Sequence, residues 1–316
     1  MSQSATSENL VRGMIDADSL RELSDKDNTT AARYIAFDLM LVALVAVVSE
    51  LYWHPVTYII AVMFIGARLI GIASIALHEA SHWMMFKDRA LNDKVAKFFN
   101  IILFLPLITG FDSYRKGHFE HHKYLGKDGD PDANVYETAY ERSIYDRKVR
   151  CLRLLSGIGF LFLTQQFLRR RFKRSSQDRL HIVIGITLVA LLAVFAPTLL
   201  TLFLLYWVVP IATWGLFINE LRMLAEHFPS EQHQQVPLEF RTHEIMNNLF
   251  DDLFVVTRGV NYHLSHHLFP TVPFYNIKAL HQQIAQSTPY QSNAIVIQGY
   301  WRFLRLYLSK SSVGVS

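Results

Sequence analysis

Residues 34–82 read YIAFDLMLVALVAVVSELYWHPVTYIIAVMFIGARLIGIASIALHEASH, a stretch in which two long apolar runs are joined by a His-Pro pair and followed by two histidines. The first run covers about residues 34–53 and the second about residues 56–77. An α-helix needs roughly 20 apolar residues to cross a hydrocarbon core about 30 Å thick. Proline disfavours helix in the residue before it, so His54-Pro55 is a natural turn. The stretch therefore predicts a helical hairpin across a membrane.

A second pair of apolar runs covers about residues 181–196 and 199–218. Two shorter runs, residues 98–110 and 152–168, are interpreted as re-entrant or interfacial, the alternative being that both cross the membrane. Five basic residues between positions 169 and 174 follow the second short run, and the positive-inside rule places them in the cytoplasm. The sequence thus predicts an all-α integral membrane protein with four transmembrane helices in two hairpins and interfacial helices.

Four crossings return the polar segments to one side of the membrane, where we expect a cytosolic helical cap. Residues 1–33 form a polar cytosolic segment without the apolar core of a signal peptide. Within it, residues 15–23 are either a short amphipathic helix on the membrane or part of a polar tail.

The bulk composition narrows the function classes. The chain has 316 residues, 51% of them hydrophobic, and a net charge of +4 that does not indicate nucleic-acid binding. Cys151 is the only cysteine in the sequence, so there is no CxxC motif for zinc or an iron–sulfur cluster and no internal disulfide. Any redox chemistry therefore needs electrons from another protein.

The histidines gather in short motifs. His78 and His82 stand at i and i+4 in HEASH, while HFEHH at 118–122 and HLSHH at 263–267 share the spacing HxxHH. On a helix, residues three or four apart share a face and can reach one metal ion. The adjacent third histidine points about 100° away and can serve a second ion. His227, in LAEHF, is a ninth candidate ligand.

Nine imidazoles exceed what one ion can use, so two ions are implied, and imidazole suits iron, zinc, copper and nickel. Nearby polar side chains can hydrogen-bond the ring N–H groups of the ligands or hold a water molecule. The candidates for this supporting role are Glu79, Glu120, Glu226, Asn261, Asp130 and Asp132. Histidines outside the motifs are interpreted as solvated or otherwise satisfied: His54, His181, His233 and His243.

HEASH also satisfies HExxH, in which two histidines bind zinc and the glutamate is a general base. An intramembrane zinc protease is therefore one alternative, although it leaves at least six clustered histidines unexplained. A metal-binding membrane protein without catalysis is another.

These motifs, in this order, resemble the membrane fatty acid desaturase and hydroxylase superfamily, and within it bacterial acyl-lipid desaturases. Carotenoid-ring and alkane hydroxylases are relatives with similar histidine boxes. The resemblance covers roughly residues 68–281 and rests on HEASH, HFEHHKYLGKDGDPD, ELRMLAEHF, and NYHLSHHLFPTVPFYN followed by Leu280-His281.

The resemblance implies two non-haem iron ions and no catalytic residues beyond their ligands. The implied ligands are His78, His82, His118, His121, His122, His227, His263, His266 and His267. It also implies molecular oxygen as co-substrate, a fatty acyl chain entering from the lipid bilayer, and a separate electron donor of ferredoxin or cytochrome type. Residues 34–290 would be the catalytic domain and 291–316 a C-terminal cytosolic segment. The active site would face the cytoplasm, in a bacterial inner membrane.

Within this resemblance, desaturation is the favoured reaction. Hydroxylation shares the first hydrogen abstraction and stays the alternative, because the histidine boxes do not separate the two. The first box has the HxxxH form, shorter than the HxxxxH of some acyl-CoA desaturases. Met223 stands where those enzymes carry an asparagine, so a tenth ligand is not implied here.

Two further features carry expectations. Arg68 lies within the second apolar run, where a charge needs a partner, and we predict that it pairs with Asp38 or Glu50 of the first run. The loop GKDGDPD at 126–132 is predicted to be a cytosolic turn, either solvated or in contact with a basic patch of the electron donor.

Overall fold

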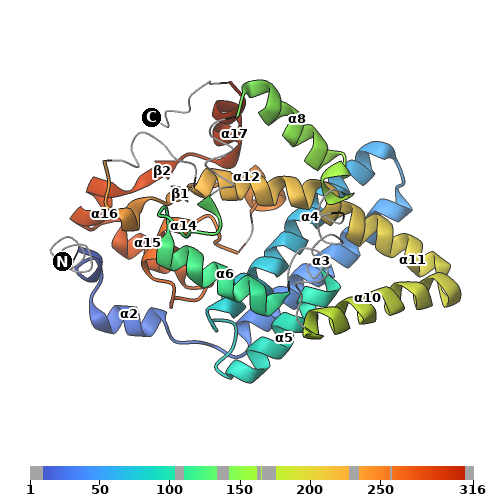
Figure 1. Ribbon diagram of the computed structural model, residues 1–316, viewed down its shortest axis with the longest axis horizontal. Helices are drawn as coiled ribbons and strands as arrows, with labels where there is room; N and C mark the ends of the chain where they lie inside the picture. Colours follow the sequence, from blue (N-terminus) through green and yellow to red (C-terminus); the bar gives the residue numbers. More distant parts are fainter. Residues whose placement is uncertain are drawn as a thin grey trace.

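The computed structural model describes residues 10–103, 110–133, 142–161, 165, 176–227, 235–256 and 258–309. Within these ranges the chain is mostly helical, and Figure 1 shows long helices toward one end and shorter elements toward the other. The predicted basic cluster at 169–174 and His233 lie outside the described residues.

The first predicted hairpin is present. Helix α3 (Thr30–Leu51) packs against α4 (Pro55–Ala73), which continues through the π-helical turn η1 (Ser74–Glu79). Both helices are long and apolar enough to cross a membrane. His54 caps α4, because its Nδ1 atom accepts a hydrogen bond from the Val56 amide, and this histidine is therefore satisfied as predicted. The extension through η1 carries the first histidine box away from the apolar run.

A third helix long and apolar enough to cross a membrane runs from Pro197 to His227. It comprises α11 (Pro197–Phe203), the π-helical turns η4 (Leu204–Val208) and η5 (Ile211–Gly215), and α12 (Leu216–His227). Proline lacks an amide hydrogen and disturbs helical hydrogen bonding, which accounts for π turns on both sides of Pro210. We expected this helix to end near residue 218. It continues to His227 because α12 still buries an apolar face.

The third helix packs closely against α4. A Cβ atom added at Gly66 would lie 3.0 Å from the carbonyl oxygen of Pro210, and one added at Gly215 would lie 3.1 Å from the same oxygen. Pro210 belongs to the third helix, so the glycine at position 66 lets the backbone of α4 approach that helix. The glycine at position 215 leaves room for a carbonyl group of its own helix.

The remaining predicted span, at residues 181–196, coincides with helix α10 (Ser176–Phe195), which packs against α11. Its described apolar stretch, Val183–Phe195, is shorter than a full crossing. The four-helix topology therefore stays a prediction, while three candidate spans are present. Both shorter apolar runs begin in a helix: α5 (Arg89–Ile102) contains the start of one, and α8 (Ile144–Leu155) the start of the other.

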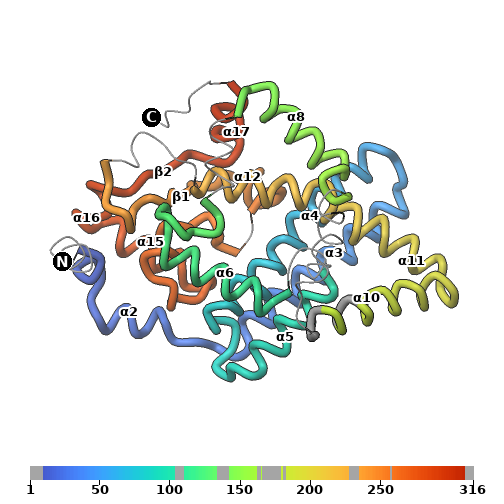
Figure 2. The backbone as a smooth tube through the Cα atoms, viewed as in Figure 1, coloured from blue at the N-terminus to red at the C-terminus, as the bar shows by residue number. Residues whose placement is uncertain are grey.

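The remaining elements surround the ends of α4 and α12. They are α2 (Ala17–Leu23), α6 (Phe111–Tyr124), η7 (Leu238–Phe240), α13 (Leu249–Phe254), α14 (His263–Leu268), α15 (Ile277–Ile284), α16 (Thr288–Asn293) and α17 (Tyr300–Ser309). Figure 2 shows the chain path from α2, which contacts α15, to α17, which packs against α8 and α12. The domain boundary at residue 290 is a prediction; beyond it, α17 buries Tyr300, Phe303 and Tyr307 in the core around α12.

The expectation of an all-α fold was wrong in one respect. Strands β1 (His243–Ile245) and β2 (Ile295–Ile297) form a two-stranded parallel sheet, with His243 opposite Ile295. The alternating burial of Ile295-Val296-Ile297 gives this pair an apolar face toward the core. Strands of three residues are too short to leave a periodic signal in the sequence.

The predicted pairing of Arg68 is confirmed, but as the weaker part of a larger group. The Nη1 atom of Arg68 lies 3.9 Å from Oδ1 of Asp38. Asp38 accepts closer, bidentate hydrogen bonds from Nε and Nη2 of Arg258. Glu50 instead accepts a hydrogen bond from the hydroxyl of Tyr206.

Candidate metal centre

Four elements bring the histidines together. The first box leaves the membrane-crossing helix at η1, the second lies on α6, the third forms α14, and His227 is the last residue of α12. These elements meet although the sequence between the second and third boxes is more than a hundred residues long. The fold therefore places all nine candidate ligands in one region, in two groups.

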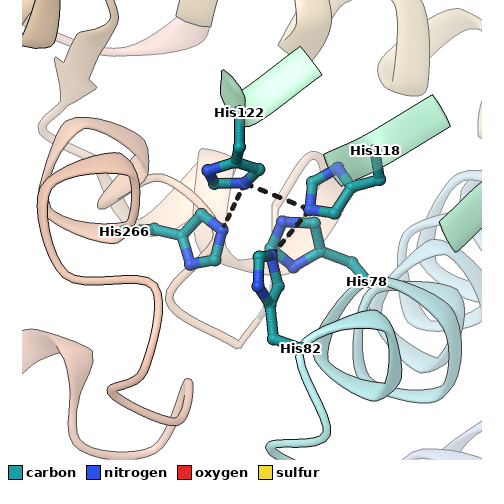
Figure 3. Close-up of side chains that lie close together, drawn as sticks. All are labelled: His78, His82, His118, His122 and His266. Atoms are coloured by element: carbon teal, nitrogen blue, oxygen red, sulfur yellow. Dashed lines mark hydrogen bonds between the residues drawn. The ribbon is translucent and has the colours of Figure 1, made fainter. Parts of the chain in front are cut away.

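The first group has five members, and Figure 3 shows their rings around a common centre. They are His78, His82, His118, His122 and His266. The Nε2 atoms of His82 and His118 are 2.8 Å apart, and that of His122 lies 3.2 Å from His118 and 3.3 Å from His266.

The second group has four members: His121, His227, His263 and His267. Nε2 of His263 lies 2.7 Å from Nε2 of His227 and 3.0 Å from Nε2 of His267. In each group the candidate ligand atoms all lie within 4.8 Å of one another.

Each HxxHH box contributes to both groups, and the two boxes do so in opposite ways. His118 and His122 belong to the five-histidine group, while His121 between them belongs to the four-histidine group. In the third box the outer pair joins the four-histidine group and His266 joins the other. This exchange follows from helix geometry, since residues four apart share a face and their neighbour points elsewhere.

The nitrogen atoms fit metal ions better than they fit each other. Two ligands at right angles, each about 2.1 Å from an ion, have nitrogen atoms about 3 Å apart, which is the spacing observed. The Nε2 atoms of His78 and His121 are buried and have no hydrogen-bond partner among the described residues. Burial also lowers the pKa of His82 to about 4 and that of His122 to about 2, so both imidazoles are neutral and keep a lone pair. The residues present therefore fit two imidazole-bound ions.

Carboxylates lie beside the outer nitrogen of three of these rings, within hydrogen-bond distance of two. Glu79 lies 3.2 Å from Nδ1 of His78, and Asp130 lies 2.9 Å from Nδ1 of His121. Glu226 is 3.6 Å from Nδ1 of His263. A carboxylate on Nδ1 fixes the tautomer that presents Nε2 to a metal. Asp132 lies farther from His121, at 3.8 Å.

The other two supporting candidates lie away from the rings in their described contacts. Glu120 lies 3.9 Å from Lys116 on α6, and its side chain is 45% exposed. The side-chain amide of Asn261 donates to the carbonyl of Ile245 and so holds strand β1. Neither contact orients a histidine.

Sequence reasoning missed the groups behind the carboxylates. Glu226 accepts hydrogen bonds from Arg222 and from the hydroxyl of Tyr300. The buried Glu244 accepts bonds from the amide and hydroxyl of Ser265, which lies between two histidines of the third box. The i, i+4 spacing of Arg222 and Glu226 was a usable signal. Tyr300 and Glu244 come from distant segments and left none.

Comparison with known proteins agrees with this geometry. A family model described as fatty acid desaturase matches residues 51–299, a range that contains all nine histidines. The chain is 29% identical over 266 residues to dihydrorhizobitoxine desaturase of Bradyrhizobium elkanii, covering 79% of this chain and 73% of that protein. It is 26% identical over 257 residues to an sn-1 oleoyl-lipid 12-desaturase of Anabaena variabilis, covering 72% and 69%.

A third relative is named a putative sphingolipid delta(4)-desaturase/C4-monooxygenase of Caenorhabditis elegans. It is 24% identical over 258 residues, which cover 81% of this chain and 66% of that protein. The family match covers well over half of the chain and includes the whole candidate metal centre. The chain is therefore a desaturase-like membrane enzyme and belongs to the fatty acid desaturase family.

Proposed function

We propose that this protein is an oxygen-dependent enzyme with two non-haem irons that desaturates a fatty acyl chain of a membrane lipid. The observation that carries the proposal is the division of nine buried or half-buried histidines into two adjacent groups. Every candidate ligand in these two groups is an imidazole. The ligands would be the five histidines of the first group on one iron and the four of the second group on the other.

When bound, the two irons would supply the oxygen-dependent oxidation that removes hydrogen from an unactivated carbon. The protein's own residues have a different task. Glu79 and Asp130 hold the imidazoles of His78 and His121 in a fixed tautomer, and the fold surrounds the histidine groups with apolar side chains. These apolar side chains restrict which part of a chain reaches the centre.

Electrons would come from a separate protein of ferredoxin or cytochrome type. An open cavity of about 460 Å³ reaches both histidine groups, because His122 and His267 line its floor. Lys123 and Lys127 also line it, so the approach favours a donor with an acidic face. Asp130 of the nearby loop is buried against His121 and is unavailable to a basic patch.

The proposed setting is a bacterial inner membrane with the centre facing the cytoplasm. Three apolar helices support a membrane location, and they carry large exposed apolar side chains such as Phe37, Met40 and Leu44. The assignment of the cytoplasmic face is our extension of the positive-inside rule.

Hydroxylation is the second candidate reaction. It is favoured by relatives whose names combine a desaturase with a monooxygenase. A zinc protease fits less well. His78 and His82 share their group with three other histidines, and Glu79 is engaged by His78 and by the amide of Phe274.

Product analysis tests the reaction. Lipids of a host expressing the protein should contain a species lighter by two mass units, which indicates a new double bond, and the His266→Ala variant should abolish it. His54→Asn is the matched control, because His54 caps a helix and lies outside both groups. A gain of sixteen units would instead establish hydroxylation, and an active His266→Ala variant would refute the metal assignment.

A further inference from the structure

A second cavity lies beside the candidate metal centre and is polar. Its volume is about 340 Å³, and its walls include Arg258, Lys278, Asp252, Asn247, Tyr34 and Tyr275. Arg258, Gly259 and Phe274 also line a much smaller space that touches His78, His263 and His266. One layer of residues therefore separates the polar cavity from both histidine groups.

The lining of this cavity contains more cationic than anionic side chains. Asp38 is fully buried and is shared by two guanidinium groups, those of Arg258 and Arg68. The Nε atom of Arg68 is buried without a hydrogen-bond partner among the described residues. Lys278 is exposed at the rim and has no ion pair within the described part of the chain. Among the residues that line the cavity, the two cations Arg258 and Lys278 stand against one carboxylate, that of Asp252.

The cavity lies beside elements that are expected at a membrane surface. Helix α13, which contributes Asp252, exposes Leu249 by 75%, Phe250 by 41% and Leu253 by 38%. On the other side, Tyr34 lies in the second turn of the membrane-crossing helix α3, and the guanidinium of Arg258 lies 4.6 Å from its ring centroid. Tyrosine and exposed apolar groups beside basic residues are typical of the membrane–water interface.

We infer that this interfacial cavity binds the oxyanion head group, carboxylate or phosphate, of the amphiphile on which the enzyme acts. Arg258 is pre-oriented by Asp38 and by stacking on Tyr34, so it presents a fixed cation at low conformational cost. Lys278 adds a second cation at the rim. The exposed apolar side chains of α13 and α3 would contact hydrocarbon beside the bound head group.

The inference rests on the proposed function only where it identifies the bound amphiphile as the substrate. Its test measures binding and does not require catalysis. The full chain, purified in a neutral detergent, is titrated with dodecyl phosphate, dodecanoate, dodecan-1-ol or inorganic phosphate, and bound molecules are counted by native mass spectrometry. Both charged amphiphiles, or one of them, should bind at least tenfold more tightly than dodecan-1-ol. Preference for one of the two identifies the head group as phosphate or carboxylate.

Lys278→Gln should weaken this binding roughly fivefold, the size expected for one charge at a membrane surface. Lys148→Gln on α8 is the matched control and should leave it unchanged, since Lys148 is exposed and does not line the cavity. Arg258→Lys should weaken binding of the charged amphiphile more than Lys278→Gln does. If the Arg258→Lys protein does not fold, the Lys278→Gln variant alone carries the test.

Equal binding of dodecan-1-ol, or equal effects of the two lysine variants, would overturn the inference. So would inorganic phosphate binding as tightly as dodecyl phosphate, because the site would then recognise a free anion. Since His266→Ala should bind dodecyl phosphate normally, failure of this test and failure of the metal assignment are distinguishable.

Discussion

His122 and His267 lie with their rings stacked, 4.2 Å between centroids, although one belongs to the five-histidine group and the other to the four-histidine group. Both rings also face the open basic cavity. The pair is thus the place where the two groups meet each other and where an external molecule comes nearest to both. We therefore expect electrons from the donor protein to enter the centre near this pair of rings.

The donor surface predicts a specific kinetic effect. Lys123→Glu combined with Lys127→Glu should raise the KM for a reduced acidic ferredoxin by about tenfold or more, because steering by opposite charge is lost. Turnover with dithionite as reductant should stay near the wild-type rate. Lys94→Glu, on α5 and outside the cavity, is the control. An unchanged KM in the double variant would remove this surface from the account.

The contact between Asp130 and His121 predicts that the protein binds iron more weakly when the Asp130 carboxylate is removed. Asp130→Asn should lower iron affinity by roughly 10- to 100-fold, the usual cost of losing a carboxylate behind a histidine ligand. Iron release to a chelator measures this effect. Asp128→Asn alters an exposed carboxylate in the same loop and should behave as wild type. Equal release from the two variants would show that Asp130 does not support a ligand.

The buried charge group predicts unequal couplings. Asp38→Asn should destabilise the protein by about 3–5 kcal/mol, because it leaves buried guanidinium groups without their carboxylate. In double-mutant cycles, Asp38 should couple more strongly to Arg258 than to Arg68, since the first contact is bidentate and the second is 3.9 Å long. Thermal or denaturant unfolding in one detergent gives the comparison. A larger coupling to Arg68 would contradict the observed arrangement.

Glu244 predicts a pH dependence of stability. Burial raises its pKa from 4.5 to about 8, so the folded protein binds a proton that the unfolded chain has released over that interval. Its contribution to stability is therefore full below about pH 4.5 and is lost as the pH rises toward 8. The melting temperature should fall over this range, and Glu244→Gln should flatten the fall, whereas Glu22→Gln on the exposed helix α2 should not. If the melting temperature of Glu244→Gln falls equally steeply with pH, the pH dependence comes from other groups.

The sequence predicted the parts of this molecule that leave a regular pattern of residue types along the chain. Apolar runs near twenty residues identified the three candidate spans found among the described residues, and the HxxHH spacing predicted that each box faces two ways. The end of the third span was missed, because apolar burial on α12 continues on one face after the uniformly apolar pattern stops. The β1–β2 pair was missed because three residues carry no pattern.

Contacts between distant segments were beyond the sequence for a different reason. Nothing in the spacing of Arg258 indicates that it, rather than Arg68, is the main partner of Asp38, because 220 residues separate the two. Tyr300 and Glu244 reach the centre only through tertiary packing of α17 and β1. The carboxylates adjacent in sequence to a histidine were easier to propose, yet Glu120 shows that adjacency alone does not place a side chain against the metal ligands.

The metal content of the purified protein tests the central claim most directly. Elemental analysis of the wild-type chain, expressed with ample iron, should give two irons per chain, and His267→Ala, which removes a ligand of the four-histidine group, should give close to one. The same variant should retain iron in the five-histidine group, because all five of its candidate ligands are unchanged. One zinc per chain, or a single iron in the wild type, would contradict the account.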